Sequence, residues 1–271
     1  QEIDARQIHE LFDFILEHQP AQMHLVLLSR ETPPLHLPRL RARGQITEID
    51  AAALRFNDEE AVHFLERTMK LPVVPEQASS MAKRTEGWVA GLQLLALTLQ
   101  RSGRHATEGV EGEVSFGNRY VVDYLVSEVL QQQPERLRSF LRATSILDRL
   151  TAPLCNAVTG RRDAETCLEE LTDANLFLIP LDEQGVWYRY YRLFAEALRS
   201  TMPDGETSAL HHRAMGWYEE QGLLEHAMHH ALARAELTDD FADVAHLISK
   251  ATEPTIRRGE VMTVRRWLDV L

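Results

Sequence analysis

From Asn57 onward, apolar residues recur at the three- and four-residue spacing of amphipathic helices almost without interruption. The main exception is the polar stretch Asp182 to Gly185, which lies between the apolar or aromatic stretches 176–181 and 186–191. Two such stretches joined by a short polar turn predict a β-hairpin. Helices of this kind bury their apolar stripes against one another. We therefore predict a mainly α, multidomain fold.

The size and composition are those of a globular protein. The chain has 271 residues, enough for one large domain or two to three small ones, and it is 44% hydrophobic and 26% charged. No apolar run approaches the roughly 18 residues that a membrane helix needs. With two cysteines and no secretory leader, a cytoplasmic location without membrane contact is expected. Because the chain opens at Gln1, we interpret it as part of a longer protein.

The net charge argues against nucleic-acid binding by this segment. Acidic residues number 41 against 29 basic ones, for a formal charge of -12, whereas phosphate backbones attract basic surfaces. Residues 120–200 alone carry twelve acidic side chains against nine arginines. We therefore expect no DNA binding by this part of the chain.

Residues 1–55 have the pattern of the C-terminal part of an α/β domain. A helix is predicted over residues 2–19, followed by a buried strand over residues 24–29 and a second extended stretch over residues 46–49. A basic loop is expected between the two extended stretches, at Arg39, Arg41 and Arg43.

Arg30 directly follows the first predicted strand. Ligands of α/β domains bind at the carboxyl ends of their strands, so this arginine is a candidate to sense a terminal phosphate. The alternative is a structural arginine that caps the strand end or pairs with a loop carboxylate.

Residues 56–110 predict a helical domain. Asn57 and Glu60 have the spacing of a capping box. The helical pattern of residues 76–100 contains Gly87 and Gly91, each costing about 1 kcal/mol relative to alanine inside a helix, so the backbone there is expected to approach another segment closely. Residues 102–117 are interpreted as a linker or mobile loop.

Residues 111–202 predict a winged helix, since helices precede the hairpin and one helix follows it. Thr151 is expected to cap a short helix that Gly160 ends. Residues 203–271 predict antiparallel helical pairs, the start of a TPR-like superhelix.

The sequence contains none of the common short motifs of nucleotide-binding, hydrolytic, zinc or redox sites. It contains no GxxxxGK loop ending in Ser or Thr, no GxGxxG, no GxSxG, no HExxH and no CxxC. We therefore predict no catalytic residue and no hydrolysis of ATP by this segment alone. Glu225, His226, His229 and His230 could chelate an ion, but a solvated helix flank explains them better, so we predict no metal site.

Several segments in the same order resemble the MalT-like large LuxR-type transcriptional activators, which are signal-transduction ATPases of the STAND class. The resemblance is carried by LVLLSRETPPLHLPRLRARGQITEI, LRFNDEEAVHFL, RTEGWVAGLQLLALTL, FLRATSILDRLTAPLCNAVTG, LTDANLFLIPLD, WYRYYRLFAEALR and EEQGLLEHAMHHAL.

The resemblance implies an ordered set of modules: a nucleotide-binding domain, a helical domain, a winged helix, a superhelical sensor and a C-terminal DNA-binding domain. It implies a weak signalling ATPase in which ADP holds a resting form, while ATP with Mg²⁺ and a small-molecule or protein inducer at the superhelix permits self-association. The phosphate-binding loop and the promoter-binding domain would lie outside this chain, so we expect no tight cofactor binding by the segment itself.

When the family's functional positions are carried over to this sequence, the resemblance implies that five residues contact the nucleotide. Arg30 matches an arginine that reads the γ-phosphate, and Gly87, Trp88 and Val89 match a turn against the adenine, with Val89 where relatives have proline. Tyr191 stands where many relatives have a histidine that contacts the ADP β-phosphate. A tyrosine cannot supply that positive charge, and simple packing is the alternative role.

These observations predict the regulatory switch of an ATP-dependent, inducer-responsive transcriptional activator. Two alternatives remain open at this point. One is a nucleotide-independent helical-repeat adaptor for a protein partner, and the other is a metal-dependent enzyme built on the histidine cluster.

Overall fold

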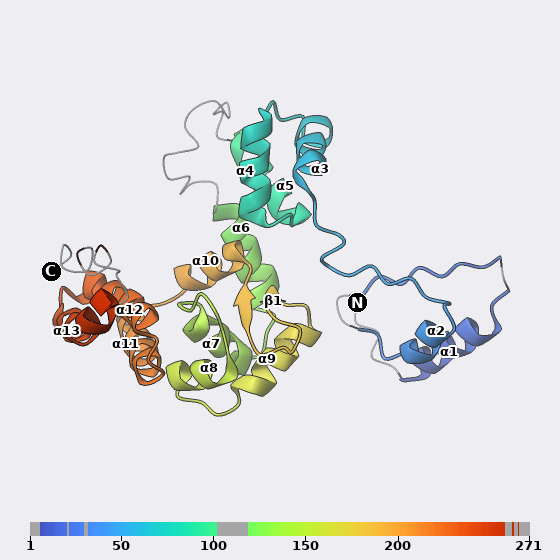
Figure 1. The fold of residues 1–271 in the computed structure, drawn as a ribbon. Helices are drawn as coiled ribbons and strands as arrows, with labels where there is room; N and C mark the ends of the chain where they lie inside the picture. The colour runs from blue at the N-terminus through green and yellow to red at the C-terminus, as the bar shows by residue number, and fades with distance from the viewer. Residues whose placement is uncertain are drawn as a thin grey trace.

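The computed structural model describes residues 6–20, 22–29, 32–101 and 119–257, together with residues 262 and 265. Helices make up most of these ranges, and their only strands are two short ones (Figure 1). The prediction of a mainly α fold is therefore confirmed. The expected linker at 102–117 lies outside the described residues. Within the described ranges, no helix combines the length and apolarity needed to cross a membrane.

The N-terminal part contains two helices, α1 (Arg6–His18) and α2 (Leu37–Ala42). His36, just before α2, places its Nδ1 atom 2.8 Å from Oδ2 of Asp13 on α1, and Arg39 pairs with Glu17. The predicted basic loop is wrong in part, because Arg39 and Arg41 lie within α2. Proline near the start of this helix favours its initiation, since the ring fixes a helical φ.

The predicted buried strand over residues 24–29 is also wrong. This segment is extended but forms no ladder, and Val26 and Leu28 are 81% and 96% exposed. The stretch 46–49 likewise forms no strand. A parallel strand needs neighbouring strands and covering helices, and the described residues supply neither to this apolar run.

A compact unit of helices follows, which we call the helical unit (residues 58–101). It contains α3 (Asp58–His63), the π-helical turn η1 (Phe64–Thr68) that continues it, α4 (Pro75–Thr85) and α5 (Val89–Arg101). The predicted capping box is confirmed, with Asn57 and Glu60 each accepting the other's backbone N–H at 2.9 Å. The core consists of buried apolar residues from all three helices and the α3–α4 connection: Ala61, Leu65, Leu71, Val73, Ala78, Ala82, Leu92 and Ala96.

The winged helix (residues 119–200) has the predicted order of elements. They are α6 (Arg119–Tyr124), its π-helical continuation η2 (Leu125–Leu130), α7 (Glu135–Thr144), α8 (Ala152–Thr159), α9 (Ala164–Asp173), β1 (Leu178–Pro180), β2 (Tyr188–Tyr190) and α10 (Arg192–Ser200). The predicted hairpin is confirmed: β1 and β2 pair antiparallel with Leu178 opposite Tyr190, and Leu150 adds an isolated bridge to Tyr188.

Both predicted ends of helix α8 are confirmed. The Thr151 hydroxyl accepts from the Leu154 N–H at 3.4 Å, and Gly160 leaves the helix with φ of 70°.

Three helices follow the winged helix: α11 (Asp204–Glu220), α12 (Leu224–Thr238) and α13 (Ala242–Arg257). Small residues on the α11–α12 seam, such as Ala214, Ala227 and Ala231, are completely or almost completely buried and let the two helices approach closely. Their core is continuous with that of the winged helix, and Arg213 donates to the Val158 carbonyl at 3.0 Å. The winged helix and α11 are thus packed as one body.

Candidate functional site

The structure brings four of the five predicted site residues to one place, where the helical unit meets the winged helix. Gly87 and Trp88 form the turn between α4 and α5, Val89 begins α5, and Tyr191 is the residue before α10. Arg30 lies outside the described residues. We call the contacting side chains of this place the junction: Arg55, Glu86, Trp88, Phe177, Arg189 and Tyr191.

Gly87 carries the close approach that the sequence predicted. Its φ is 73°, and its carbonyl accepts the Phe56 N–H at 2.9 Å. A Cβ atom at this position would lie 2.6 Å from the Phe56 carbonyl oxygen, so no other residue fits without moving the backbone. Glu86 precedes it with φ of 52°, which makes two successive left-handed residues. The helical pattern of residues 76–100 is thereby split into two helices, α4 and α5.

Gly91 is required by its neighbour Trp88. A Cβ atom on Gly91 would lie 2.4 Å from Cε3 of the indole ring, so the ring folds back over the first turn of α5 only because this glycine is there. The two glycines are therefore needed for different contacts: Gly87 lets the backbone of Phe56 approach, and Gly91 leaves room for the ring of Trp88.

Aromatic rings join the two sides of the junction. Phe177, just before β1, meets Trp88 edge to face with 5.0 Å between ring centroids and Tyr191 edge to face at 5.8 Å. The Phe177 carbonyl also accepts the Tyr191 N–H at 2.9 Å. Phe177 has φ of 53°, a left-handed conformation that costs a non-glycine residue about 1 to 3 kcal/mol and persists only where its surroundings enforce it.

Two arginine contacts complete the junction. Arg55, in the segment before α3, donates from Nη2 to the Tyr191 hydroxyl at 2.5 Å, and its Cζ lies 5.0 Å from the centre of the ring. Arg189 on β2 pairs with Glu86 at 2.8 Å. The buried atoms Arg55 Nε and Glu86 Oε2 have no hydrogen-bond partner among the described residues. The junction therefore combines charge, strain and unused hydrogen-bonding capacity.

Sequence reasoning missed four members of the junction. Arg55 and Tyr191 are 136 residues apart, and Glu86 and Arg189 are 103 apart, so no local spacing connects them. Phe177 belongs to an apolar stretch in which nothing marks it as left-handed. Only Glu86 had a signal, since its neighbour Gly87 already indicated a turn.

His230, one of the histidines considered as metal ligands, instead pairs with His211 on the seam of α11 and α12. His211 and His230 are buried, and their Nδ1 atoms lie 2.9 Å apart, so one ring donates a proton and the other accepts it. Burial lowers the pKa of His211 to about 4 and that of His230 to about 3. His226 stacks on the Tyr218 ring. No three His, Cys, Asp or Glu side chains converge as metal ligands within the described ranges.

Fold and junction together define a mainly helical chain in which a winged helix connects a small helical unit to antiparallel helical pairs. The profile of the MalT winged helix domain matches residues 126–210. The chain is 33% identical over 258 residues to the HTH-type transcriptional regulator MalT of Vibrio cholerae, a match that covers 94% of this chain and 28% of the relative. It is 34% identical over 232 residues to the regulator of the same name from Klebsiella pneumoniae, covering 84% of this chain and 26% of that one.

The chain therefore contains the winged helix domain of MalT-like regulators at residues 126–210 and is similar to these regulators along most of its length. It spans between a quarter and a third of the length of these two relatives.

Proposed function

We propose that this chain is the regulatory switch segment of a transcriptional regulator that depends on ATP and responds to an inducer. The observation that carries the proposal is the junction, because it joins the helical unit to the winged helix through contacts that a modest displacement would break. The names of the two relatives support the transcriptional role. Self-association, an inducer at the C-terminal helices and promoter binding outside this chain belong to the same proposal, as does a weak signalling ATPase activity of the complete protein.

The residues of the junction suit a nucleotide with Mg²⁺ in the complete protein. Gly87, Trp88 and Val89 are the residues that would contact the base, and the space beside Gly87 is filled by Phe56 in this structure. Tyr191 offers a neutral hydroxyl, and Arg55 brings a permanent positive charge to it. The proposal is thus that Arg55 and Tyr191 together do what a histidine at position 191 does in the relatives that the sequence resembles. Arg30 would meet the terminal phosphate.

ADP and ATP binding to the complete protein tests the nucleotide part of the proposal. Equilibrium dialysis is expected to give one bound ADP per protein, with Arg55→Gln weakening ADP binding about tenfold through the loss of one charge-assisted hydrogen bond. Arg67→Gln is the matched control, since Arg67 is exposed in the same part of the chain. Arg30→Ala is expected to impair the response to ATP while ADP binding persists. A complete protein that binds neither nucleotide would contradict the proposal and favour an adaptor.

A further inference from the structure

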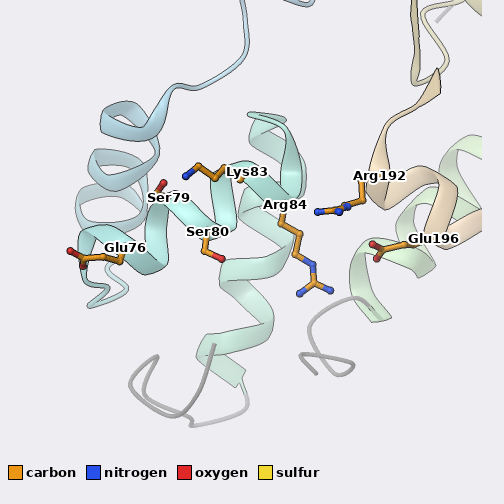
Figure 2. Close-up of a pocket in the computed structure, with 7 residues that line it drawn as sticks. All are labelled: Glu76, Ser79, Ser80, Lys83, Arg84, Arg192 and Glu196. Carbon is orange, nitrogen blue, oxygen red and sulfur yellow. The ribbon is translucent and has the colours of Figure 1, made fainter. Parts of the chain in front are cut away.

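A polar cleft lies between α4 of the helical unit and α10 of the winged helix (Figure 2). Its volume is about 710 Å³, within the range of roughly 300 to 1,000 Å³ that small-molecule sites occupy. The lining consists of polar and charged side chains from both elements: Glu76, Ser79, Ser80, Lys83, Arg84, Arg192 and Glu196. The cleft lies next to the junction in the chain, since Arg192 directly follows Tyr191, but it is lined by none of the junction's residues.

The spacing on α4 arranges hydroxyl groups and positive charges in two rows. Ser79 and Lys83 are four residues apart, as are Ser80 and Arg84, so each hydroxyl lies one turn from a cation on the same face of the helix. Figure 2 shows the Lys83 side chain extending toward Ser79, while Arg192 extends from α10 toward Arg84. The Ser79 hydroxyl already donates to Oδ2 of Asp58 at 2.5 Å, so the donors that face the cleft from the two elements are Ser80, Lys83 and Arg192.

The positive charges of the cleft are not all neutralised by the protein. Lys83 and Arg192 are exposed and have no hydrogen-bond or ion-pair partner among the described residues. Arg192 is also the first residue of α10, so the positive end of that helix adds to the potential at the cleft. Two carboxylates also line the cleft: Glu76 lies seven residues before Lys83 on α4, about 10 Å along the helix, and Glu196 lies one turn after Arg192 on α10.

We infer that this cleft binds a phosphate group, as free phosphate or as a small phosphomonoester, and that the ligand ties the helical unit to the winged helix. A tetrahedral dianion offers several acceptor oxygens to donors on different sides, which matches the Ser80 hydroxyl and the Lys83 ammonium on α4 and the Arg192 guanidinium on α10. A carboxylate would leave part of this donor set unused. Because Lys83 and Arg192 come from the two sides, both must contribute for the ligand to bridge them.

Thermal unfolding of this chain with added phosphate tests the inference. Sodium phosphate and glycerol phosphate are expected to raise the melting temperature progressively, compared with sodium chloride at equal ionic strength, because a ligand that binds only the folded state stabilises it. Calorimetric titration then gives the dissociation constant. Replacing both cations, Lys83→Ala with Arg192→Ala, is expected to weaken phosphate binding by about tenfold or more, since each removes a charge-assisted contact.

The controls separate this site from general anion binding and from the junction. Arg67→Ala with Arg162→Ala removes two exposed arginines outside the cleft and should leave phosphate binding unchanged. Tyr191→Phe, in the junction, should leave it unchanged as well. Equal binding by the Lys83 and Arg192 variant, equal stabilisation by chloride, or binding of ADP without binding of phosphate would each overturn the inference.

Discussion

Among the described glycines, Gly87 is the one at which the backbone leaves least room for a side chain. It combines a left-handed φ with a backbone contact, whereas a Cβ atom added at Gly160 or Gly222, which have similar φ values, would meet nothing within 4 Å. A left-handed alanine costs about 1 to 2 kcal/mol. Because the backbone contact adds to this cost, Gly87→Ala should lower the free energy of unfolding by about 3 kcal/mol. Urea unfolding followed by circular dichroism measures this.

Gly222→Ala is the matched control for that substitution, with an expected loss of about 1 kcal/mol from its φ alone. Equal losses at positions 87 and 222 would show that the carbonyl of Phe56 imposes no constraint.

The contact of Arg55 with Tyr191 predicts energetic coupling between two residues that are distant in sequence. Their hydrogen bond is charge-assisted, so a double-mutant cycle with Arg55→Met and Tyr191→Phe should give a coupling free energy of about 1 kcal/mol. The same urea measurement supplies all four free energies. Additive losses would mean that the two side chains are merely neighbours.

Single residues could be predicted from the sequence where the residue type itself determines the local backbone conformation. The two glycines, the capping box at Asn57 and the cap at Thr151 are signals of that kind, since each acts on backbone within a few residues. Arg55 and Phe177 could not be found in this way, because what makes them part of the junction is a partner far along the chain.

At the scale of elements, the seam of α11 and α12 predicts a loss of stability in acid. His211 and His230 are kept neutral by burial, with pKa values of about 4 and about 3 against an ordinary 6.5. The unfolded chain therefore takes up protons below pH 6.5 that the folded chain refuses until pH 4 or lower, so stability falls as the pH drops through this window.

The double variant His211→Gln with His230→Gln should lose most of that pH dependence. The measurement is the urea midpoint at about pH 7 and about pH 5, in which the difference should be clearly smaller for the variant. His212→Gln, a substitution of an exposed histidine, is the control and should keep the wild-type difference. A wild-type midpoint that does not fall between these two pH values would contradict the neutral pair.

Elements were predictable from sequence to the extent that they are stabilised locally or by their neighbours. The hairpin and most helices from Asn57 onward follow from spacing and turn residues and form as expected, whereas the helical pattern of residues 76–100 forms two helices, α4 and α5. The apolar run at 24–29 has the composition of a buried strand, but composition cannot supply the adjacent strands that such a strand needs, and Leu28 is exposed here.

For the whole molecule, we propose that the helical unit and the winged helix change their arrangement with the bound nucleotide. The strained residues Glu86 and Phe177 and the junction contacts favour one arrangement, and a nucleotide could shift the equilibrium only by binding one arrangement more tightly than another. The domain limits expected from the sequence, at residues 55, 110 and 202, would then be the boundaries of the domains that move relative to one another.

Distance measurement by electron spin resonance tests whether this rearrangement occurs. Spin labels introduced by Arg67→Cys on the helical unit and Arg162→Cys on the winged helix sit at exposed positions, while the native Cys155 and Cys167 are buried. In the complete protein, the distance distribution between the labels should differ between saturating ADP and a non-hydrolysable ATP analogue with Mg²⁺. Tight binding of both nucleotides with one unchanged distance distribution would contradict a rearrangement driven by the nucleotide.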